Sequence, residues 1–329
     1  MSLNQLTTGM TLAGVPVLIV EKKVATAKNG KSYADLTVRD SSASLKCKIW
    51  NFTDSDWIAV GKVVDISGDT STYNGELQFT ISLINPNASK KPEEFSKKTR
   101  FDTEQMWYEL IKHLDTIEEP LTLYVATALL EGNKEAFMKS PAATGMHNAW
   151  YGGLLEHTLG MCKLAKEICY HYESTYGEGK FSPDKVMFGI LLHDIGKIWE
   201  YDVNNSAFPH TPDGILVNHL VLGPAMIYEK CNKWWDLNVL SDNDFGQAHF
   251  ERERAHLMHL IVAHHGQIDW GSAVVPSTLE AILVHHIDNL DTKFMHALEL
   301  VEGKEGQISG FSEKSWNTKT SYLKYNTEA

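Results

Sequence analysis

Cysteine and long apolar runs are scarce in this chain. It has four cysteines in 329 residues, and none of them forms a CxxC pair. A disulfide framework and a zinc knuckle are therefore disfavoured, and free thiols in a reducing compartment are the better interpretation. No apolar run approaches the ~18 residues of a membrane helix, and the first residues lack the basic-then-apolar pattern of a signal peptide. We therefore expect a cytoplasmic protein with no membrane partner.

Histidine is absent from the first 100 residues, and the balance of basic and acidic residues also changes near residue 100. Residues 1–100 hold 13 Lys and Arg against 10 Asp and Glu, whereas residues 101–329 hold 17 against 32, together with all fifteen histidines. This asymmetry predicts a mildly basic first domain and an acidic, histidine-rich second domain of the kind that binds cations. For most of those carboxylates, solubility alone is the simpler explanation.

The first part is rich in short alternating strands. Between residues 17 and 85 we expect five strands, with two of the turns marked by Asn-Gly pairs at residues 29–30 and 74–75. In the expected strands at 32–39 and 45–50, apolar residues alternate with polar ones, so that one face of each can enter a core. Five strands of this spacing in under 90 residues predict a small closed barrel.

The outward face of the second and third expected strands carries aromatic and basic side chains together. A single-stranded nucleic acid needs both, because bases stack on aromatic rings and phosphates are attracted by cations. For any single residue, a solvated strand face with an incidental lysine is the simpler interpretation. As a group, the candidates for nucleic-acid binding are Tyr33, Arg39, Lys46, Lys48, Trp50 and, near the second hairpin, Tyr73. With this pattern the segment resembles the oligonucleotide-binding (OB) fold.

Composition also predicts the domain bounds. Residues 89–102 have the proline and charges of a linker, and from residue 103 helical periodicity replaces strand alternation. We therefore expect a multidomain chain, with an all-β OB-fold barrel at 1–88, a linker at 89–102 and an all-α bundle at 103–305. The remaining tail, 306–329, is given no role.

Histidines and acids recur at the ends of the expected helices of the second part. His193-Asp194 stands between an apolar helical run and a Gly-Lys pair, and four further sites have His or Asp beside small or apolar residues. Helix ends gather at one end of an all-α bundle, so such side chains can meet there. Each histidine taken alone is more simply a surface or core residue. Together they suit a divalent ion held by nitrogen and oxygen ligands.

In this set the chain resembles the HD-domain metal-dependent phosphohydrolases, whose signature runs H…HD…H…HH…D. The resemblance implies one or two divalent transition-metal ions, with Mn²⁺ the first choice and Co²⁺, Fe²⁺, Ni²⁺ or Zn²⁺ as alternatives, and a metal-activated water that attacks a phosphodiester. Asp194 and Lys197 are the catalytic candidates, although Lys197 could equally oppose the helix dipole. The implied metal ligands are His157, His193, Asp194, His219, His264, His265 and Asp288.

Three further histidines lie near this set. His147 precedes His157 by ten residues, and it is as readily a plain loop histidine as a contact for substrate phosphate. His285 and His286 precede Asp288 on the same expected helix. We interpret these two as packing residues or as residues that support a ligand.

The order of barrel and bundle resembles the YhaM-type 3′-5′ exoribonucleases. Residues 152–158, 191–198, 264–266 and 280–291 carry this resemblance, and Ala273 stands where a proline is expected. It implies a 3′-5′ exonuclease that releases 5′-nucleotides from single-stranded RNA, with single-stranded DNA as a further substrate and a homo-oligomer as a compatible state. Two alternatives stay open. One is a nucleotide or cyclic-nucleotide phosphohydrolase whose barrel serves assembly, and the other is a non-catalytic single-strand-binding protein.

Overall fold

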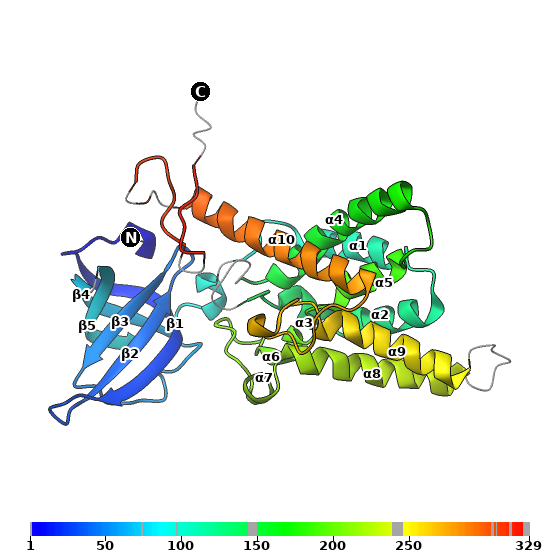
Figure 1. The fold of residues 1–329 in the computed structure, drawn as a ribbon. Coiled ribbons are helices and arrows are strands. Elements are labelled where there is room, and N and C mark those ends of the chain that lie inside the picture. The colour runs from blue at the N-terminus through cyan, green and yellow to red at the C-terminus, as the bar shows by residue number, and fades with distance from the viewer. Residues whose placement is uncertain are drawn as a thin grey trace. The chain divides into compact units, whose positions relative to one another are not determined.

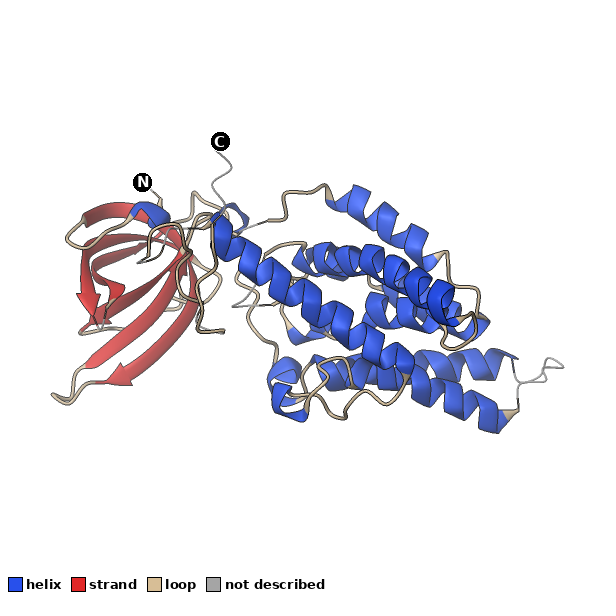
Figure 2. Ribbon diagram, turned by 45° about the horizontal axis from the view of Figure 1, so that its top comes forward, coloured by secondary structure: helices blue, strands red, loops and turns tan. Residues whose placement is uncertain are grey.

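The computed structural model describes residues 2–73, 75–96, 98–143, 150–238, 246–303, 306, 308–315 and 318–324. The chain divides into two compact units (Figure 1). The first comprises Met1–Lys98 and Tyr201–Thr211, and the second comprises Thr99–Glu200 and Pro212–Ala329. Figure 2 shows the strands gathered in the first unit and the long helices in the second. The predicted fold class, a small β-barrel followed by a helical bundle, is confirmed.

Five strands close the barrel in the order β1-β2-β3-β5-β4. They are β1 (Thr11–Thr26), β2 (Ser32–Arg39), β3 (Ser44–Trp50), β4 (Val63–Tyr73) and β5 (Glu76–Pro86). All neighbours pair antiparallel except β3 and β5, which pair in parallel. The long β1 shifts register between Ile19 and Glu21 and again between Leu12 and Val15. Such bulges bend a strand, and β1 can therefore pair with β2 at one end and with β4 at the other.

Strand alternation fills the interior of the barrel. In β2 and β3 the hydrogen-bonded register sets Leu36 opposite Cys47 and Val38 opposite Leu45. All four side chains are buried, and the residues between them face outward. The predicted inward face is therefore confirmed, and the outward face carries the polar and aromatic residues.

Part of the second half of the chain belongs to the barrel unit. In the segment Tyr201–Thr211, the carbonyl of Ser206 accepts hydrogen bonds from Arg39 Nη2 (2.6 Å) and from Ser96 Oγ (2.8 Å). Phe95, in the 3-10 turn η2 (Pro92–Phe95), is buried with Leu18 of β1. The chain therefore passes between the two units three times.

The second unit is built from helices whose labels appear in Figure 1. They are α1 (Thr103–Leu114), α2 (Pro120–Gly132), α3 (Lys134–Lys139), α4 (Gly153–Tyr176), α5 (Pro183–Leu192), α6 (Lys197–Glu200), α7 (Pro212–Leu216), α8 (His219–Asn238), α9 (Gln247–Val262) and α10 (Leu279–Glu302), with the 3-10 turn η3 (Ile268–Trp270) after α9. None of the helices in the described part of the chain combines the length and hydrophobicity needed to cross a bilayer.

Helix α5 lies at the centre of the bundle. It contacts α1, α2, α4, α9 and α10, and every side chain from Val186 to Leu192 is buried. Gly189 permits this packing, because a Cβ there would lie 2.5 Å from Cγ2 of Val284. The Ser182 hydroxyl caps its first turn by accepting from the Lys185 amide. Since α5 is enclosed by other helices, the residues that follow its last turn emerge inside the bundle.

Candidate metal centre and nucleic-acid surface

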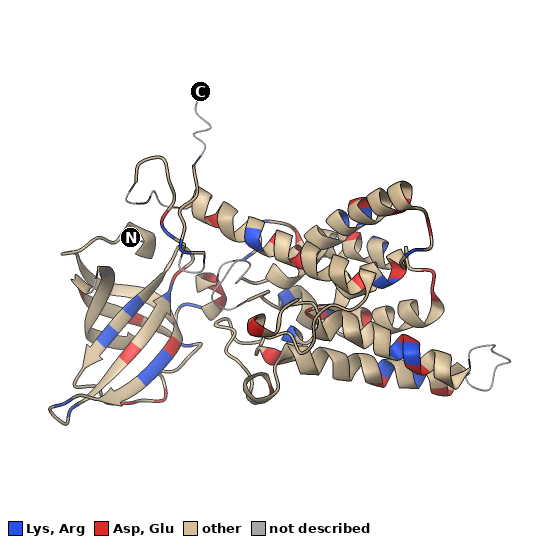
Figure 3. Ribbon diagram, viewed as in Figure 1, with Lys and Arg blue, Asp and Glu red and all other residues tan. Residues whose placement is uncertain are grey.

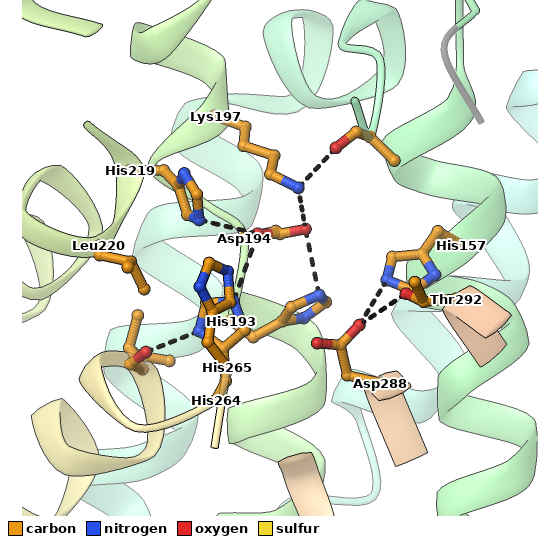
Figure 4. Close-up of polar contacts among 12 residues, drawn as sticks. His157, His193, Asp194, Lys197, His219, Leu220, His264, His265, Asp288 and Thr292 are labelled. Atoms are coloured by element: carbon orange, nitrogen blue, oxygen red, sulfur yellow. Dashed lines mark hydrogen bonds and ion pairs between the residues drawn. The ribbon is translucent and has the colours of Figure 1, made fainter. Parts of the chain in front are cut away.

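The structure brings all seven candidate metal ligands into one cluster (Figure 4). His157 comes from the start of α4, and His193 and Asp194 follow α5 directly. His219 begins α8, His264 and His265 follow α9, and Asp288 lies on α10. Gly196 makes the approach of α8 possible, because a Cβ there would lie 2.5 Å from the carbonyl oxygen of His219. The glycine two residues after Asp194 is therefore a packing requirement of the site.

Two groups of ligand atoms lie side by side in this cluster. His157, His193 and Asp194 each offer one ligand atom within 4.8 Å of the others, and so do His219, His264 and His265. Oδ1 of Asp194 lies 3.6 Å from Nε2 of His219 and 3.6 Å from Nε2 of His264. Oδ2 of Asp194 lies 3.2 Å from Nε2 of His193. Asp194 thus faces both groups, and Asp288 completes the first with Oδ1 3.3 Å from Nε2 of His157.

Each of the five histidines is oriented by a partner outside the cluster. A ring whose Nδ1 hydrogen is bound in this way presents the Nε2 lone pair to a metal, an arrangement typical of metal-binding histidines. The Nδ1 atoms pair with Asp291 Oδ2 for His157 (2.7 Å), the Ile190 carbonyl for His193 (2.9 Å), Glu200 Oε2 for His219 (2.5 Å), the Ile261 carbonyl for His264 (2.6 Å) and the Trp270 carbonyl for His265 (3.0 Å). The rings are therefore held in position by the fold itself.

Among the residues that the structure describes, three buried polar atoms at the centre of the cluster have no hydrogen-bond partner. They are Nε2 of His193, Oδ1 of Asp194 and Nε2 of His219. Leaving a buried polar atom unsatisfied costs about 1–3 kcal/mol, and here three such atoms face one another. Imidazole nitrogens and carboxylate oxygens are a suitable donor set for a first-row divalent ion. The residues present therefore fit a bound metal.

The protonation states follow from burial and neighbouring charge. Burial lowers the pKa of His264 and of His265, and neighbouring imidazoles lower both further, which favours neutral rings. Burial alone would raise the pKa of Asp194, but the charges of Lys197 and His193 outweigh it and hold that pKa well below the usual value. Burial opposes a charge on His157, yet hydrogen bonds to Asp288 and Asp291 raise its pKa to about 9. A metal would have to displace that proton.

Lys197 lies beside Asp194, the carboxylate that faces both groups of ligand atoms. Its Nζ donates to Asp194 Oδ2 (2.6 Å) and to the carbonyl of Ala142 (2.5 Å). The same lysine lines a pocket of about 300 Å³ whose walls include Asp194, His264, His265 and Asp288. The ammonium group is therefore positioned both to hold Asp194 and to meet a negatively charged ligand.

Several residues of the site escaped the sequence analysis. Asp291 and Glu200 fix rings, and Thr292 donates to Asp288 Oδ1 (3.2 Å). Asp291 has a local signal, since it follows Asp288 by three residues on one helix, whereas nothing in the sequence distinguishes Glu200 from other acids.

The neighbouring histidines have separate environments. His285 is buried, lines the pocket and pairs through Nδ1 with the carbonyl of His264 (2.8 Å). His286 is exposed. His147 lies outside the described residues.

On the barrel, three of the predicted nucleic-acid-binding residues form a cluster. Tyr33 of β2 lies opposite Trp50 of β3, with ring centroids 5.5 Å apart. Lys48 Nζ lies 4.3 Å from the Tyr33 centroid and 5.0 Å from the Trp50 centroid, and it also pairs with Asp35 (2.8 Å). Figure 3 shows basic and acidic positions interleaved on these strands. We refer to Tyr33, Lys48 and Trp50 as the aromatic-lysine cluster.

The other three predicted binding residues lie in different environments. Lys46 is exposed on β3 opposite Thr37, on the same face as the aromatic-lysine cluster. Tyr73 ends β4 and is 65 % exposed. Arg39 is half-buried, and its guanidinium donates to Ser206 and Ser96. Arg39 therefore holds a loop of its own unit in this structure.

Comparisons with known proteins match both units. Residues 154–293 match the HD domain, and residues 18–87 match an OB-fold nucleic acid binding domain. The chain is 29% identical over 297 residues to the 3′-5′ exoribonuclease YhaM of Bacillus subtilis (strain 168), with 88% of each chain covered. It is 29% identical over 305 residues to the protein of that name from Halalkalibacterium halodurans, covering 90% of this chain and 88% of the relative. Residues 154–293 are therefore an HD domain and residues 18–87 an OB-fold domain, and the chain resembles the YhaM-type exoribonucleases along most of its length.

Proposed function

We propose that this chain is a metal-dependent 3′-5′ exonuclease that hydrolyses the phosphodiester bonds of single-stranded RNA and releases 5′-nucleotides. The observation on which this rests is the convergence of five oriented imidazoles and two carboxylates in one cluster beside a pocket. The relatives that match 88% of the chain are named 3′-5′ exoribonucleases, which supports the substrate and the polarity. Single-stranded DNA is a second substrate, because RNA and DNA strands both offer bases that can stack on aromatic rings and phosphates that cations attract.

The cofactor is one or two divalent transition-metal ions. His157, His193, Asp194 and Asp288 would hold one ion, and His219, His264 and His265 a second, with Asp194 shared between them. Mn²⁺ is the first choice because carboxylates in the ligand set favour the harder end of the transition series, and Co²⁺, Fe²⁺, Ni²⁺ and Zn²⁺ follow. When bound, such an ion supplies a water of lowered pKa and polarises a phosphoryl oxygen.

Lys197 is the catalytic group that the chain itself contributes beside the ligands. Its ammonium is fixed by Asp194 and by the carbonyl of Ala142 at the wall of the pocket. A fixed positive charge there would stabilise negative charge that develops on the phosphoryl oxygens during attack. At the same time it compensates the buried charge of Asp194.

The barrel would capture the strand. Residues 101–329 carry 17 basic against 32 acidic residues, and this negative charge repels a polyanion. The aromatic-lysine cluster offers two rings for bases and one cation for a phosphate, and Lys46 adds a second cation on the same face. Because barrel and bundle belong to one chain, a captured strand has a raised effective concentration at the metal centre. Arg39 and Tyr73 are further candidate contacts for the strand, ranked after the aromatic-lysine cluster and Lys46.

The test is a strand-shortening assay. The purified chain, Mn²⁺ and a 5′-labelled single-stranded RNA should give a ladder of products that shorten from the 3′ end, together with 5′-nucleotides. Hydrolysis of mononucleotides without strand shortening would instead support a nucleotide phosphohydrolase. Strand binding without any turnover would support a binding protein whose histidine cluster is structural.

A further inference from the structure

Trp270 is an exposed aromatic residue at the edge of the metal-centre pocket. It ends the turn η3, five residues after His265, and 47 % of it is exposed to solvent. It lines the same pocket as Asp194, His264, His265 and Asp288. Leaving a large aromatic ring in water forgoes the free-energy gain of burying its apolar surface.

The fold holds Trp270 firmly beside the ligands. Its carbonyl pairs with Nδ1 of His265 (3.0 Å), and its amide donates to the carbonyl of Gln267 (3.1 Å). Gly271 follows in the left-handed region (φ +91°), which closes the turn and which a residue with a Cβ would strain. The backbone of Trp270 is therefore tied to the ring of a metal-ligand candidate, which places the indole beside the site.

A positive charge accompanies the ring. Nζ of Lys293, from the neighbouring α10, lies 5.3 Å from the Trp270 ring centroid. The ring of His285 lies 6.1 Å from the indole centroid and is tilted by 46°. Lys293 is exposed, so its ammonium adds positive charge at the rim where a phosphate-bearing ligand would enter.

The size of the pocket restricts where a nucleotide can lie. When a phosphate of the strand reaches the metal centre, the adjoining nucleoside must lie against the walls of the same pocket of about 300 Å³. Nucleobases stack on indole rings regardless of their identity, because every base has a π face. Trp270 provides such a face within this pocket, and the amide of Asn289 lines it as well.

We propose that Trp270 is the stacking platform for the base of the 3′-terminal nucleotide. This proposal rests on the exonuclease function proposed above and names the part of the substrate that the pocket recognises. Recognition by stacking predicts a nuclease that prefers a base at the 3′ end over an abasic end but accepts all four bases. A nuclease that recognised the edges of the base through hydrogen bonds would instead discriminate among the four bases.

The experiment compares two RNA strands with the full-length chain and Mn²⁺. The strands have the same length and sequence, but one ends in an ordinary nucleotide and the other in an abasic nucleotide. The wild type should act on the ordinary end with a kcat/KM about tenfold higher. Trp270→Ala should lose that preference by lowering kcat/KM on the ordinary end alone, and Trp270→Phe should keep most of it. Tyr108→Ala removes a comparable exposed ring, which lies 4.1 Å from Lys112 Nζ and outside this pocket, and should change neither value.

A binding measurement gives a second readout. With Mn²⁺ present, a nucleoside 5′-monophosphate should bind the wild type about tenfold more tightly than ribose 5-phosphate, and Trp270→Ala should bind the two alike. Equal shortening of both strands by the wild type would overturn the stacking proposal and leave the exonuclease function standing. Shortening of neither strand would overturn both. If Trp270→Ala fails to fold, unchanged preference in Trp270→Leu would equally overturn the proposal.

Discussion

Nδ1 of His219 donates to Oε2 of Glu200 across 2.5 Å, and the His219 amide donates to the same oxygen (3.1 Å). Glu200 ends α6, and the next residue, Tyr201, already belongs to the barrel unit. The side chain that orients one candidate ligand is thus adjacent in sequence to a segment of the other unit. Burial raises the pKa of Glu200, but its contacts with His219 lower it more, so that Glu200 is charged.

Glu200→Gln should weaken metal binding. An amide at this position can still contact the ring but supplies no negative charge, and loss of such a supporting carboxylate costs about 10–100-fold in metal affinity. Titration calorimetry with Mn²⁺ measures this directly. Glu229→Gln, at an exposed position of α8, is the matched control and should leave affinity unchanged. Equal affinity in the wild type and Glu200→Gln would show that His219 needs no such support.

Asp194→Asn should abolish turnover and leave strand binding intact. The substitution keeps the size of the side chain but removes the charge that faces both groups of ligand atoms. We expect the rate of RNA shortening to fall by about 10³-fold or more, as it should when EDTA removes the metal from the wild type. The affinity of the variant for the same RNA, measured by filter binding, should stay within about twofold of the wild type, because the aromatic-lysine cluster is unchanged. Turnover close to that of the wild type would refute a metal-dependent hydrolase.

Tyr33→Ala and Trp50→Ala should each weaken capture of long strands. Stacking on one aromatic ring contributes about 1–3 kcal/mol per base, and the two rings lie 5.5 Å apart around Lys48. Binding of a long RNA should therefore fall at least about fivefold in each variant, whereas hydrolysis of a dinucleotide should not change. Trp50→Phe, which keeps a ring, is the control. A matching loss on the dinucleotide would mean that the barrel serves the bundle in another way.

Lys46→Ala tests the electrostatic part of capture. If Lys46 contacts a phosphate, its removal should reduce the slope of log affinity against log salt by about 0.7 for a single strand. Fluorescence anisotropy at four salt concentrations measures the slope. Lys112→Ala, on α1 of the bundle, should leave it unchanged. A slope that stays constant in Lys46→Ala would place the phosphate track elsewhere.

Glu280→Gln should make stability less dependent on pH. Glu280 is 7 % exposed, lies 3.3 Å from Nε2 of His256 and accepts from the amide of Ser182 (2.8 Å). Burial raises its pKa, but these hydrogen bonds outweigh that and lower it from 4.5 to about 2. As pH falls, Glu280 is therefore protonated at a higher pH in the unfolded state than in the folded state. The stability that its charge contributes is complete above pH about 4.5 and is lost as pH falls towards about 2.

The free energy of unfolding at pH 7 should fall by up to about 3 kcal/mol in Glu280→Gln. Urea titrations at pH 7, 5, 4 and 3 should show the difference from the wild type shrinking as pH decreases. Glu178→Gln, at an exposed position after α4, should follow the wild type at every pH. A difference that is constant across this range would assign the effect to packing and not to the charge.

Local properties of the chain were enough to predict the barrel and the identity of the candidate ligands. Alternation in 32–39 and 45–50 sets which side chains of β2 and β3 are inward, because successive residues of a strand face opposite sides. The spacing of His157, His193-Asp194, His219, His264-His265 and Asp288 gave the resemblance to the HD-domain proteins. Both depend on residue type and on short intervals along the chain.

Which further residues support the barrel and the candidate ligands was decided by the tertiary structure. Glu200 and Asp291 orient rings, Trp270 reaches the pocket, and Arg39, on the outward face of β2, donates to the carbonyl of Ser206. The roles of Glu200, Asp291 and Arg39 each depend on one polar group lying about 3 Å from another that is distant in sequence. Among 42 acidic residues nothing in the sequence distinguishes Glu200, and the spacing of Asp291 from Asp288 is only a local signal, because the rings that they orient are brought to them by the packing of α4, α6, α8 and α10.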